Sequence, residues 1–150
     1  SGDFLLEADR RVRVRDGVAL SVDVYRPAQG GVAVPGRFPV LLERTPYGKR
    51  RAVLNQAGEY FAKAGYVVVM QDVRGRFASE GEWYFLSEQE GPDGFDTMEW
   101  IGWDRLLFAS DYPHWDFDLP SSIWDLPFLS EKAKHNILGG NAARLLGLPA

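Results

Sequence analysis

Alternation of apolar and polar residues predicts a β-hairpin near the start of the chain. Residues 11–15 (RVRVR) alternate, and residues 18–25 (VALSVDVY) alternate again. Asp16-Gly17 between the two runs is typical of a tight turn, because both residue types accept a positive φ. The pattern therefore predicts two antiparallel strands within residues 11–26, with the three arginines of the first run on its solvent face.

After the hairpin, short apolar runs alternate with helical spacing. The runs FPVLLER (38–44) and YVVVM, which opens a strand over 66–72, are typical of strands buried on both faces. Apolar residues over 51–64 recur at helical spacing, and Gly65 follows as a helix stop. A second helix is predicted from Pro92 to about Ile101.

The last third of the chain predicts a short strand and a helix. Residues 105–109 (RLLFA) are an apolar run, and Ser130 can cap a helix that ends before Gly139-Gly140. Strands that alternate with helices imply right-handed crossovers and a parallel sheet. We therefore predict an α/β fold, in which the hairpin joins parallel strands near 38–44, 66–72 and 105–109, with flanking helices.

Composition and charge exclude several classes of protein. The 150 residues are 45% hydrophobic and include no cysteine, which excludes general disorder and a disulfide framework. The net charge of −4, without a basic patch, argues against a nucleic-acid partner. There is no apolar run of membrane-spanning length and no signal peptide, so we expect no membrane partner and a cytoplasmic protein.

Four separated motifs carry a resemblance to a known family. In chain order they are VRDGVALSVDVYRP, PVLLERTPYGK, AGYVVVMQDVRGRFASEGEW and EGPDGFDTMEWI. Residues 8–102 thus resemble the N-terminal part of the cocaine-esterase and X-Pro dipeptidyl-peptidase family of α/β-hydrolases. The resemblance implies hydrolysis of small-molecule esters or amides by a Ser-His-Asp triad, with no metal and no cofactor.

The same resemblance assigns a role to Tyr47. The tyrosine of the family's R-x-P-Y motif donates its phenolic O–H to the oxyanion, and a fixed donor at that point lowers the barrier. Tyr47 also follows a strand that we expect to be central, where α/β sheets present active groups. The alternative is a tyrosine that packs over the sheet edge. For Asp72, Arg74 and Arg76, in the D-V-R-G-R loop, we expect bracing of the loop rather than substrate contact.

The rest of a hydrolase site is missing from the sequence. There is no G-x-S-x-G nucleophile elbow, and no residues match the triad Asp and His. A strand over 105–109 would place Ser110 and, four residues later, His114 near Tyr47. Against this, Phe108 and Tyr112 occupy positions where an elbow needs small residues. The alternative is a polar loop in which Ser110 or Asp111 caps local N–H groups, so we expect a catalytically incomplete chain.

Residues 103–150 resemble a second family. The strings DRLLFASDYPHWDFD and LSEKAKHNILGGNAARLLGL look like the C-terminal end of a decarboxylase-like amidohydrolase, in which Asp111 would match an aspartate beside the metal. The H-x-H pair of that family is absent, and one carboxylate cannot build a transition-metal site, so we expect no metal. The chain is then a chimera of segments 1–102 and 103–150, joined near Gly102–Asp104 and packed as one domain.

Two further groups of residues have structural explanations. Asp93, Asp96 and Glu99 fit a solvated helix start better than an acidic site. Four aromatic residues of the tail fit core or oligomer contacts better than a binding face: Trp103, Tyr112, Trp115 and Trp124.

Three hypotheses for function remain at this point. The first is an ester or amide hydrolase by family, which would need Ser110 or a partner chain as the source of its nucleophile. The second is a non-catalytic chimeric or engineered α/β domain that covers its exposed apolar surface by forming a homo-oligomer. The third is a fragment of an amidohydrolase-like metal enzyme.

Overall fold

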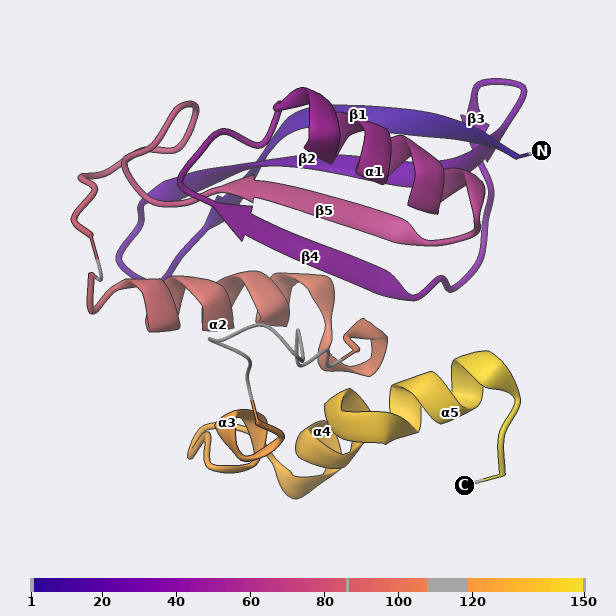
Figure 1. Cartoon of the computed structure of the whole chain (residues 1–150). Coiled ribbons are helices and arrows are strands. Elements are labelled where there is room, and N and C mark those ends of the chain that lie inside the picture. Colours follow the sequence, from indigo (N-terminus) through magenta and orange to yellow (C-terminus); the bar gives the residue numbers. More distant parts are fainter. Residues whose placement is uncertain (1, 86, 108–118, 150) are drawn as a thin grey trace. The chain divides into compact units, whose positions relative to one another are not determined.

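The computed structural model describes residues 2–85, 87–107 and 119–149. The chain divides into two compact units, Ser1–Trp100 and Ile101–Ala150, each of which is described by itself (Figure 1). Among the described residues, no helix has the length and apolar character that crossing a bilayer requires.

A mixed five-stranded sheet forms the first unit. The strand order is β1-β2-β5-β4, and β3 pairs with β2 outside this path (Figure 1). β1 and β5 are antiparallel to β2, whereas β4 runs parallel to β5 with Val40 opposite Val67. The predicted α/β class is confirmed. The strand bounds are β1 Asp3–Arg13, β2 Ala19–Gln29, β3 Val32–Ala33, β4 Val40–Thr45 and β5 Val67–Asp72.

The predicted hairpin is confirmed, but its strands are longer than predicted. Residues 14–18 connect β1 to β2, and the Val14 N–H donates to the Val18 carbonyl at 2.9 Å. The second strand does not end at residue 26 as predicted, because β2 continues through Pro27 to Gln29 and the short β3 pairs with its end. A bulge between Glu7 and Arg10 places Asp9 at φ 51°. Because a bulge re-aims a side chain, Asp9 leaves the regular alternation of β1.

Two helices cover opposite faces of the sheet: α1 (Ala52–Lys63) and α2 (Glu90–Ile101), near the ranges predicted for them. Val68 and Met70 of β5 pack with Ala62 of α1. The next side chain along β5, Gln71, donates its Nε2 to Thr97 Oγ1 of α2 at 2.9 Å. Successive side chains of a strand point to opposite faces, so α1 and α2 lie on different sides of β5.

The strand predicted over 105–109 is not found over residues 105–107. Trp103–Arg105 form a single 3-10 turn after Gly102, which has φ 99°, and residues 108 and 109 lie outside the described part. The Leu106 carbonyl accepts a hydrogen bond from Asn141 Nδ2 at 2.7 Å, which ties this segment to a helix of its own unit. β4 is therefore an edge strand in the described sheet, and Leu41 and Leu42 are half-buried rather than fully buried as predicted.

The second unit, as far as it is described, consists of short helical segments. Ser130 caps α4 as predicted, since its Oγ accepts the Ala133 N–H at 3.2 Å. The predicted stop at Gly139-Gly140 is wrong, because a π-helical turn carries the chain into α5, which ends before Gly147 at φ 66°. The segments are α3 Ser121–Trp124, α4 Glu131–His135, the π turn η2 Asn136–Gly140 and α5 Asn141–Leu146.

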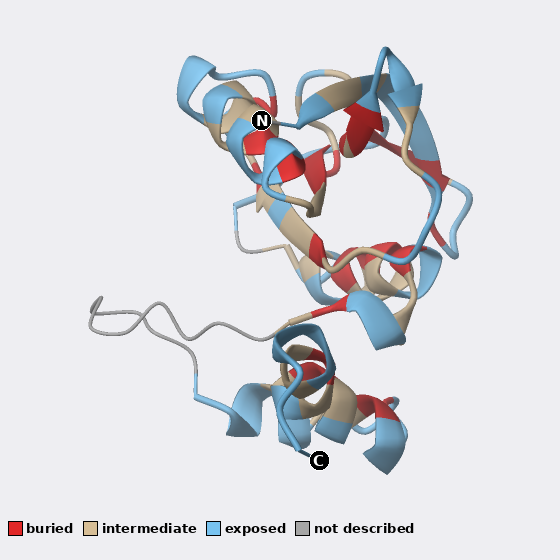
Figure 2. Cartoon of the chain, turned by 90° about the vertical axis from the view of Figure 1, so that its right-hand side faces the viewer, coloured by how far each residue is buried: buried red, intermediate tan, exposed pale blue. Residues whose placement is uncertain are grey.

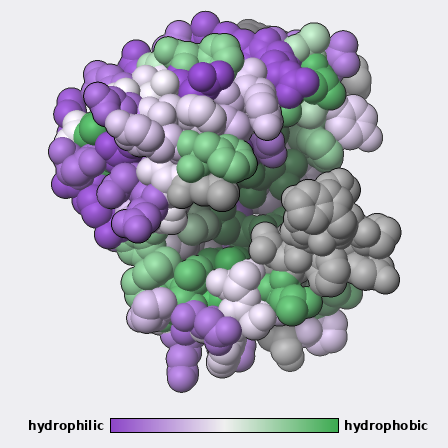
Figure 3. Space-filling view, turned by 60° about the vertical axis from the view of Figure 1, so that its left-hand side comes forward, coloured by the Kyte–Doolittle hydropathy of each residue, from purple (hydrophilic) through white to green (hydrophobic). Residues whose placement is uncertain are grey.

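Burial in the first unit is concentrated in β2 and β5 (Figure 2). Leu20 and Val22 of β2 are fully buried, and so is the polar Asp23 beside them. Outside this core, the first unit presents a largely hydrophilic face with a few apolar side chains (Figure 3). A buried carboxylate requires charged partners, and these lie at the end of the sheet described next.

Candidate functional site

β4 and β5 end side by side, and the loops that follow them carry the candidate residues. Thr45, the last residue of β4, is paired with Asp72, the last residue of β5, and the Val73 N–H donates to the Thr45 carbonyl at 3.2 Å. The carboxyl ends of parallel strands are where open α/β sheets bind ligands. One loop connects Thr45 to α1, and the other leaves Asp72 with the D-V-R-G-R motif.

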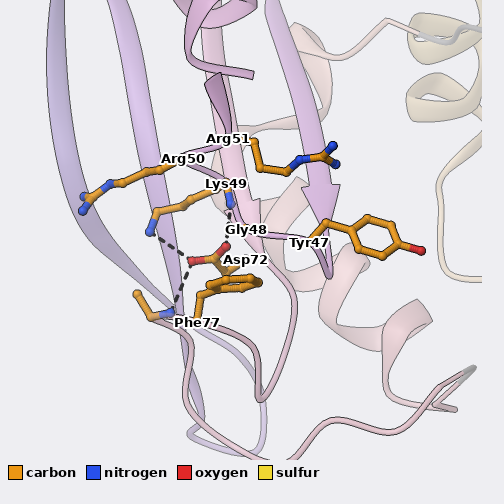
Figure 4. Close-up of a pocket in the computed structure, with 8 residues that line it drawn as sticks. Tyr47, Gly48, Lys49, Arg50, Arg51, Asp72 and Phe77 are labelled. Carbon is orange, nitrogen blue, oxygen red and sulfur yellow. Dashed lines mark hydrogen bonds and ion pairs between the residues drawn. The ribbon is translucent and has the colours of Figure 1, made fainter. Parts of the chain in front are cut away.

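A pocket of about 500 Å³ lies between these two loops (Figure 4). Such a volume accommodates a small-molecule ligand. Its lining residues come from the β4–α1 loop and from the start of the loop after β5: Tyr47, Gly48, Lys49, Arg50, Arg51, Asp72, Phe77 and Ala78.

Tyr47 lines this pocket with an accessible side chain. It is 67% exposed, and its ring points away from Asp72 (Figure 4). The Arg51 guanidinium carbon lies 5.9 Å from the centroid of the Tyr47 ring, within the range of a cation–π contact. This exposure suits a phenolic O–H available to a ligand better than it suits a ring packed over the sheet edge.

Hydrogen bonds hold the backbone on both sides of Tyr47. Its own N–H donates to Thr45 Oγ1 at 3.1 Å. The preceding carbonyl, of Pro46, accepts Arg76 Nε at 2.9 Å, and the Lys49 N–H donates to Asp72 Oδ1 at 2.7 Å. A donor that acts on a developing charge needs a fixed backbone, because reorganisation during the reaction costs free energy.

Asp72 and Lys49 form the buried base of this loop. The Asp72 side chain is 2% exposed, and Lys49 is equally buried. Lys49 Nζ lies 3.1 Å from Asp72 Oδ2, which also accepts the Ala78 N–H at 3.3 Å. The bracing role expected of Asp72 agrees with these contacts, since its carboxylate joins both loops of the pocket.

A larger charged network surrounds Lys49. Its Nζ lies 3.0 Å from Asp9 Oδ1 and 3.7 Å from Asp23 Oδ1. Arg50 Nε lies 2.7 Å from Asp23 Oδ2, and Arg50 Nη2 lies 2.7 Å from Asp9 Oδ2. The hydrogen bond from Lys49, followed by that from Arg50, holds the pKa of Asp9 far below its usual range. The same contacts with Asp23 and Asp9 raise the pKa of Arg50.

Sequence reasoning missed Asp9 and Asp23. Asp23 lies within an alternating strand, where a polar residue is normally assigned to the solvent face. Asp9 reaches the network only through the bulge of β1. The available signal was the pair of basic residues Lys49-Arg50 a few residues after a predicted buried strand, because a lysine that becomes buried there requires acidic partners.

Arg74 and Arg76 also brace the loops, as expected. Arg74 pairs with Asp93 of α2 and with Asp16, and the hydrogen bonds that Arg74 donates to Asp93 are the main cause of its raised pKa. The guanidinium carbon of Arg76 lies 5.3 Å from the centroid of the Phe77 ring and 5.1 Å from that of Trp83.

The prediction that Asp93 belongs to a solvated helix start is wrong. Asp93 is 1% exposed, because the start of α2 packs against the loop after β5 and meets Arg74 there. Asp96, one turn later, accepts Arg15 Nη2 at 2.7 Å, and this contact lowers the pKa of Asp96.

Phe77 and Gly48 lie next to each other in the pocket lining, and both have a positive φ. Phe77 has φ 48°, which is uncommon for a bulky residue, and Gly48 has φ 97°. A Cβ added at Gly48 would lie 3.1 Å from the Phe77 ring. No signal in the sequence identified this contact, although strain of this kind is often found at functional sites.

The remaining sequence candidates lie mostly outside the described residues. Ser110, Asp111 and His114 are among them, together with Tyr112 and Trp115. The proposed Ser/His/Tyr arrangement therefore stays a prediction. Within the described ranges, no three His, Cys, Asp or Glu residues are grouped as metal ligands would be. Trp124 is 43% exposed and makes an edge contact with the His135 ring at 5.2 Å.

Comparisons with known proteins agree with the hydrolase resemblance. Cocaine esterase from Rhodococcus sp. (strain MB1 Bresler) is 42% identical over an alignment of 104 positions, which covers 67% of this chain and 17% of that protein. A crystal structure of an aminopeptidase from a marine sediment Thaumarchaeota archaeon aligns with a TM-score of 0.53 and 28% identity, over 66% of this chain and 19% of that one. An α-amino acid ester hydrolase aligns with a TM-score of 0.52 and 29% identity over the same shares.

The chain spans less than a fifth of the length of these relatives. None of these matches is to an amidohydrolase. The resemblance of residues 103–150 to that family therefore stays a prediction. Residues 16–107 match the family described as X-Pro dipeptidyl-peptidase (S15 family). This match covers more than half of the sequence, and the chain therefore belongs to the X-Pro dipeptidyl-peptidase (S15) family.

Proposed function

We propose that this chain carries the oxyanion-binding part of a site that hydrolyses small-molecule esters or amides, with the Tyr47 O–H as the donor. One observation carries the proposal: Tyr47 is open to the pocket, while hydrogen bonds fix the backbone before and after it. The family and the names of the relatives, which include an esterase and an ester hydrolase, support the reaction class.

The chemistry requires a donor aimed at the carbonyl oxygen. Attack on an ester or amide carbonyl moves negative charge onto that oxygen, and a preorganised O–H stabilises the charge as it forms. Loss of one such donor lowers kcat by about 10²–10³-fold in well-studied hydrolases. The anchors at Thr45, Arg76 and Asp72 give Tyr47 the fixed backbone that such a donor needs.

We further propose that the nucleophile comes from a partner chain rather than from the residues of this sequence. The sequence has no G-x-S-x-G elbow. The chain alone is then catalytically incomplete, and Ser110 with His114 is the alternative source. A fluorophosphonate probe separates the two cases. We expect no adduct, whereas an adduct on Ser110 that Ser110→Ala abolishes would overturn this part of the proposal.

The oxyanion role of Tyr47 is tested by binding of a stable tetrahedral anion. Phenyl methylphosphonate is titrated into the chain, and the amide NMR shifts of Tyr47 and Gly48 are followed. Tyr47→Phe keeps the ring and removes only the hydroxyl, and we expect it to weaken binding about tenfold, as for loss of one hydrogen bond to a charged group. Equal affinity of the two proteins would show that the hydroxyl is not the donor.

The two other hypotheses for function predict different results. A self-associating non-catalytic domain predicts an oligomer in sedimentation experiments and no response of Tyr47 to the phosphonate. An amidohydrolase-like fragment predicts zinc or manganese bound to the purified chain, which elemental analysis would detect. Neither hypothesis is favoured by an observation on the described residues.

A further inference from the structure

Three cationic residues line the Tyr47 pocket, and two of them are already neutralised. Lys49 is buried against Asp72, Asp9 and Asp23. Arg50 pairs with Asp23 and Asp9 at 2.7 Å each. If Lys49 turned toward a ligand, the buried Asp72 would lose its cationic partner, which is costly. If Arg50 did so, the buried Asp23 would keep only Lys49, at 3.7 Å, as a described cationic partner.

Arg51 differs from these two residues. No ion pair between it and an acidic side chain is found within the described ranges of the chain, and its guanidinium lies over the Tyr47 ring. Figure 4 shows the Arg51 guanidinium and the Tyr47 ring extending to the same side, away from Asp72. Arg51 is thus the one lining cation without a described acidic partner, and it lies beside the phenol that we propose as the oxyanion donor.

Among the described lining residues there is no competing negative charge. Asp72 is the only acidic one of them, and both of its carboxylate oxygens accept hydrogen bonds from Lys49 or Ala78. The other lining residues are uncharged: Tyr47, Gly48, Phe77 and Ala78. Arg51 also precedes α1, whose first turn has no acidic residue, so the helix dipole adds to the positive potential.

We propose that Arg51 is a specificity-determining residue, which makes this pocket prefer esters or amides whose acyl part carries a carboxylate. A guanidinium presents a planar set of donors that matches a carboxylate in two-point contact. The inference rests on the proposed function, since it places this second group of the substrate beside the carbonyl that Tyr47 would bind. A cationic substrate would be repelled at the same position.

Solvent exposure limits the size of this preference. An exposed ion pair contributes modestly and is screened by salt. At low ionic strength we therefore expect about a fivefold preference for an anionic ligand over a neutral one of similar shape. The preference should shrink as sodium chloride is raised to about 0.5 M, where the Debye length falls to a few ångströms.

The test compares two matched esters on the intact chain. Monoethyl succinate and ethyl butyrate differ mainly in a terminal carboxylate in place of a methyl group. Dissociation constants come from the amide NMR shifts of Tyr47 and Gly48. Arg51→Gln should remove the preference, and Arg51→Lys should keep part of it, because it retains the charge but not the planar fork. Arg10→Gln is the control. Arg10 pairs with Glu7 on β1, so this substitution removes the same charge at a position away from the pocket lining.

Each outcome decides between the two proposals. Equal affinity of the wild-type chain for both esters, or an unchanged preference in Arg51→Gln, overturns the specificity role of Arg51 while the phosphonate result for Tyr47 stands independently. If Arg51→Gln removes the preference but Tyr47→Phe binds phosphonate normally, the oxyanion assignment fails and the charge preference stands. Loss of preference in Arg10→Gln would show that total charge, rather than Arg51, attracts the anion.

Discussion

Arg74 and Asp93 form a two-point ion pair inside the first unit, with Nε 2.8 Å from Oδ2 and Nη2 2.7 Å from Oδ1. Asp93 is 1% exposed and the Arg74 side chain is 10% exposed, so both charges depend on each other for solvation. The pair connects the loop after β5 to α2. The same loop contributes Phe77 and Ala78 to the pocket, so α2 supports the site without lining it.

Asp93→Asn should destabilise the first unit strongly. The substitution leaves the buried Arg74 guanidinium with Asp16 as its remaining acidic partner, and loss of one partner of a buried pair costs about 3 kcal/mol. Urea unfolding measures the free energy. Asp96→Asn is the matched control, because its partner Arg15 is 55% exposed and the expected loss is below about 1 kcal/mol. Similar losses in both variants would contradict the buried character of the Arg74 pair.

Asp72→Asn should loosen the Tyr47 loop. The amide that replaces the carboxylate no longer offers two anionic oxygens to the Lys49 N–H and Nζ. We expect hydrogen exchange at the Lys49 amide to accelerate about tenfold, which corresponds to roughly 1.4 kcal/mol of local stability. Glu59→Gln on α1 removes an exposed carboxylate 3.8 Å from Lys63 and should leave this exchange rate unchanged. An unchanged rate in Asp72→Asn would exclude the anchoring role.

Gly58→Ala should destabilise the protein although alanine is the better helix former. A Cβ at Gly58 would lie 2.8 Å from the Tyr25 ring, and overpacking of this kind costs about 1–3 kcal/mol. This loss exceeds the gain of about 1 kcal/mol in helix propensity. Gly91→Ala in α2 meets no atom within 4 Å, so it should be neutral or stabilising. The melting temperature should therefore fall for Gly58→Ala and stay the same or rise for Gly91→Ala. A higher melting temperature for Gly58→Ala would contradict the packing of α1 on Tyr25.

The charged network predicts a loss of stability in acid. The pKa of Asp9 is lowered in the folded protein by Lys49 and Arg50, so the folded state favours its ionised form. This contribution is complete above the ordinary aspartate pKa of about 3.9 and is lost as the pH falls below it toward the folded value. The free energy of unfolding should therefore fall below about pH 4. Asp9→Asn should be less stable than the wild type at pH 6, and its free energy of unfolding should fall less steeply as the pH is lowered. An equally steep fall in the variant would exclude Asp9 as a source of the pH dependence.

Local patterns predicted much of the first unit. Sequence patterns predicted the hairpin, α1 and β5 correctly. Alternation, helical spacing and an apolar run are each visible within a few neighbouring residues. The Ser130 cap was found for the same reason, since the capping hydrogen bond spans three residues. The R-x-P-Y and D-V-R-G-R motifs located both loops of the pocket before the structure showed that they meet.

The errors arise where distant residues decide the outcome. Residues 105–107 have the pattern of a strand, but Asn141 binds the Leu106 carbonyl. Asp93 looked solvated because its partner Arg74 is 19 residues away. The bulge that turns Asp9 toward Lys49 depends on the register of β1 with β2, which no single stretch of sequence specifies. The left-handed φ of Phe77 is likewise set by its surroundings.

The contact between Gly48 and Phe77 restricts how this pocket can diversify. Any other residue at position 48 would have to displace the aromatic ring and accept φ 97° as well. Position 51 has no such restriction, because its side chain is exposed to solvent. New ligand preferences should therefore arise by substitution of Arg51 while Gly48 is retained. A directed-evolution library on this scaffold would be most productive if it varied position 51 and kept glycine at position 48.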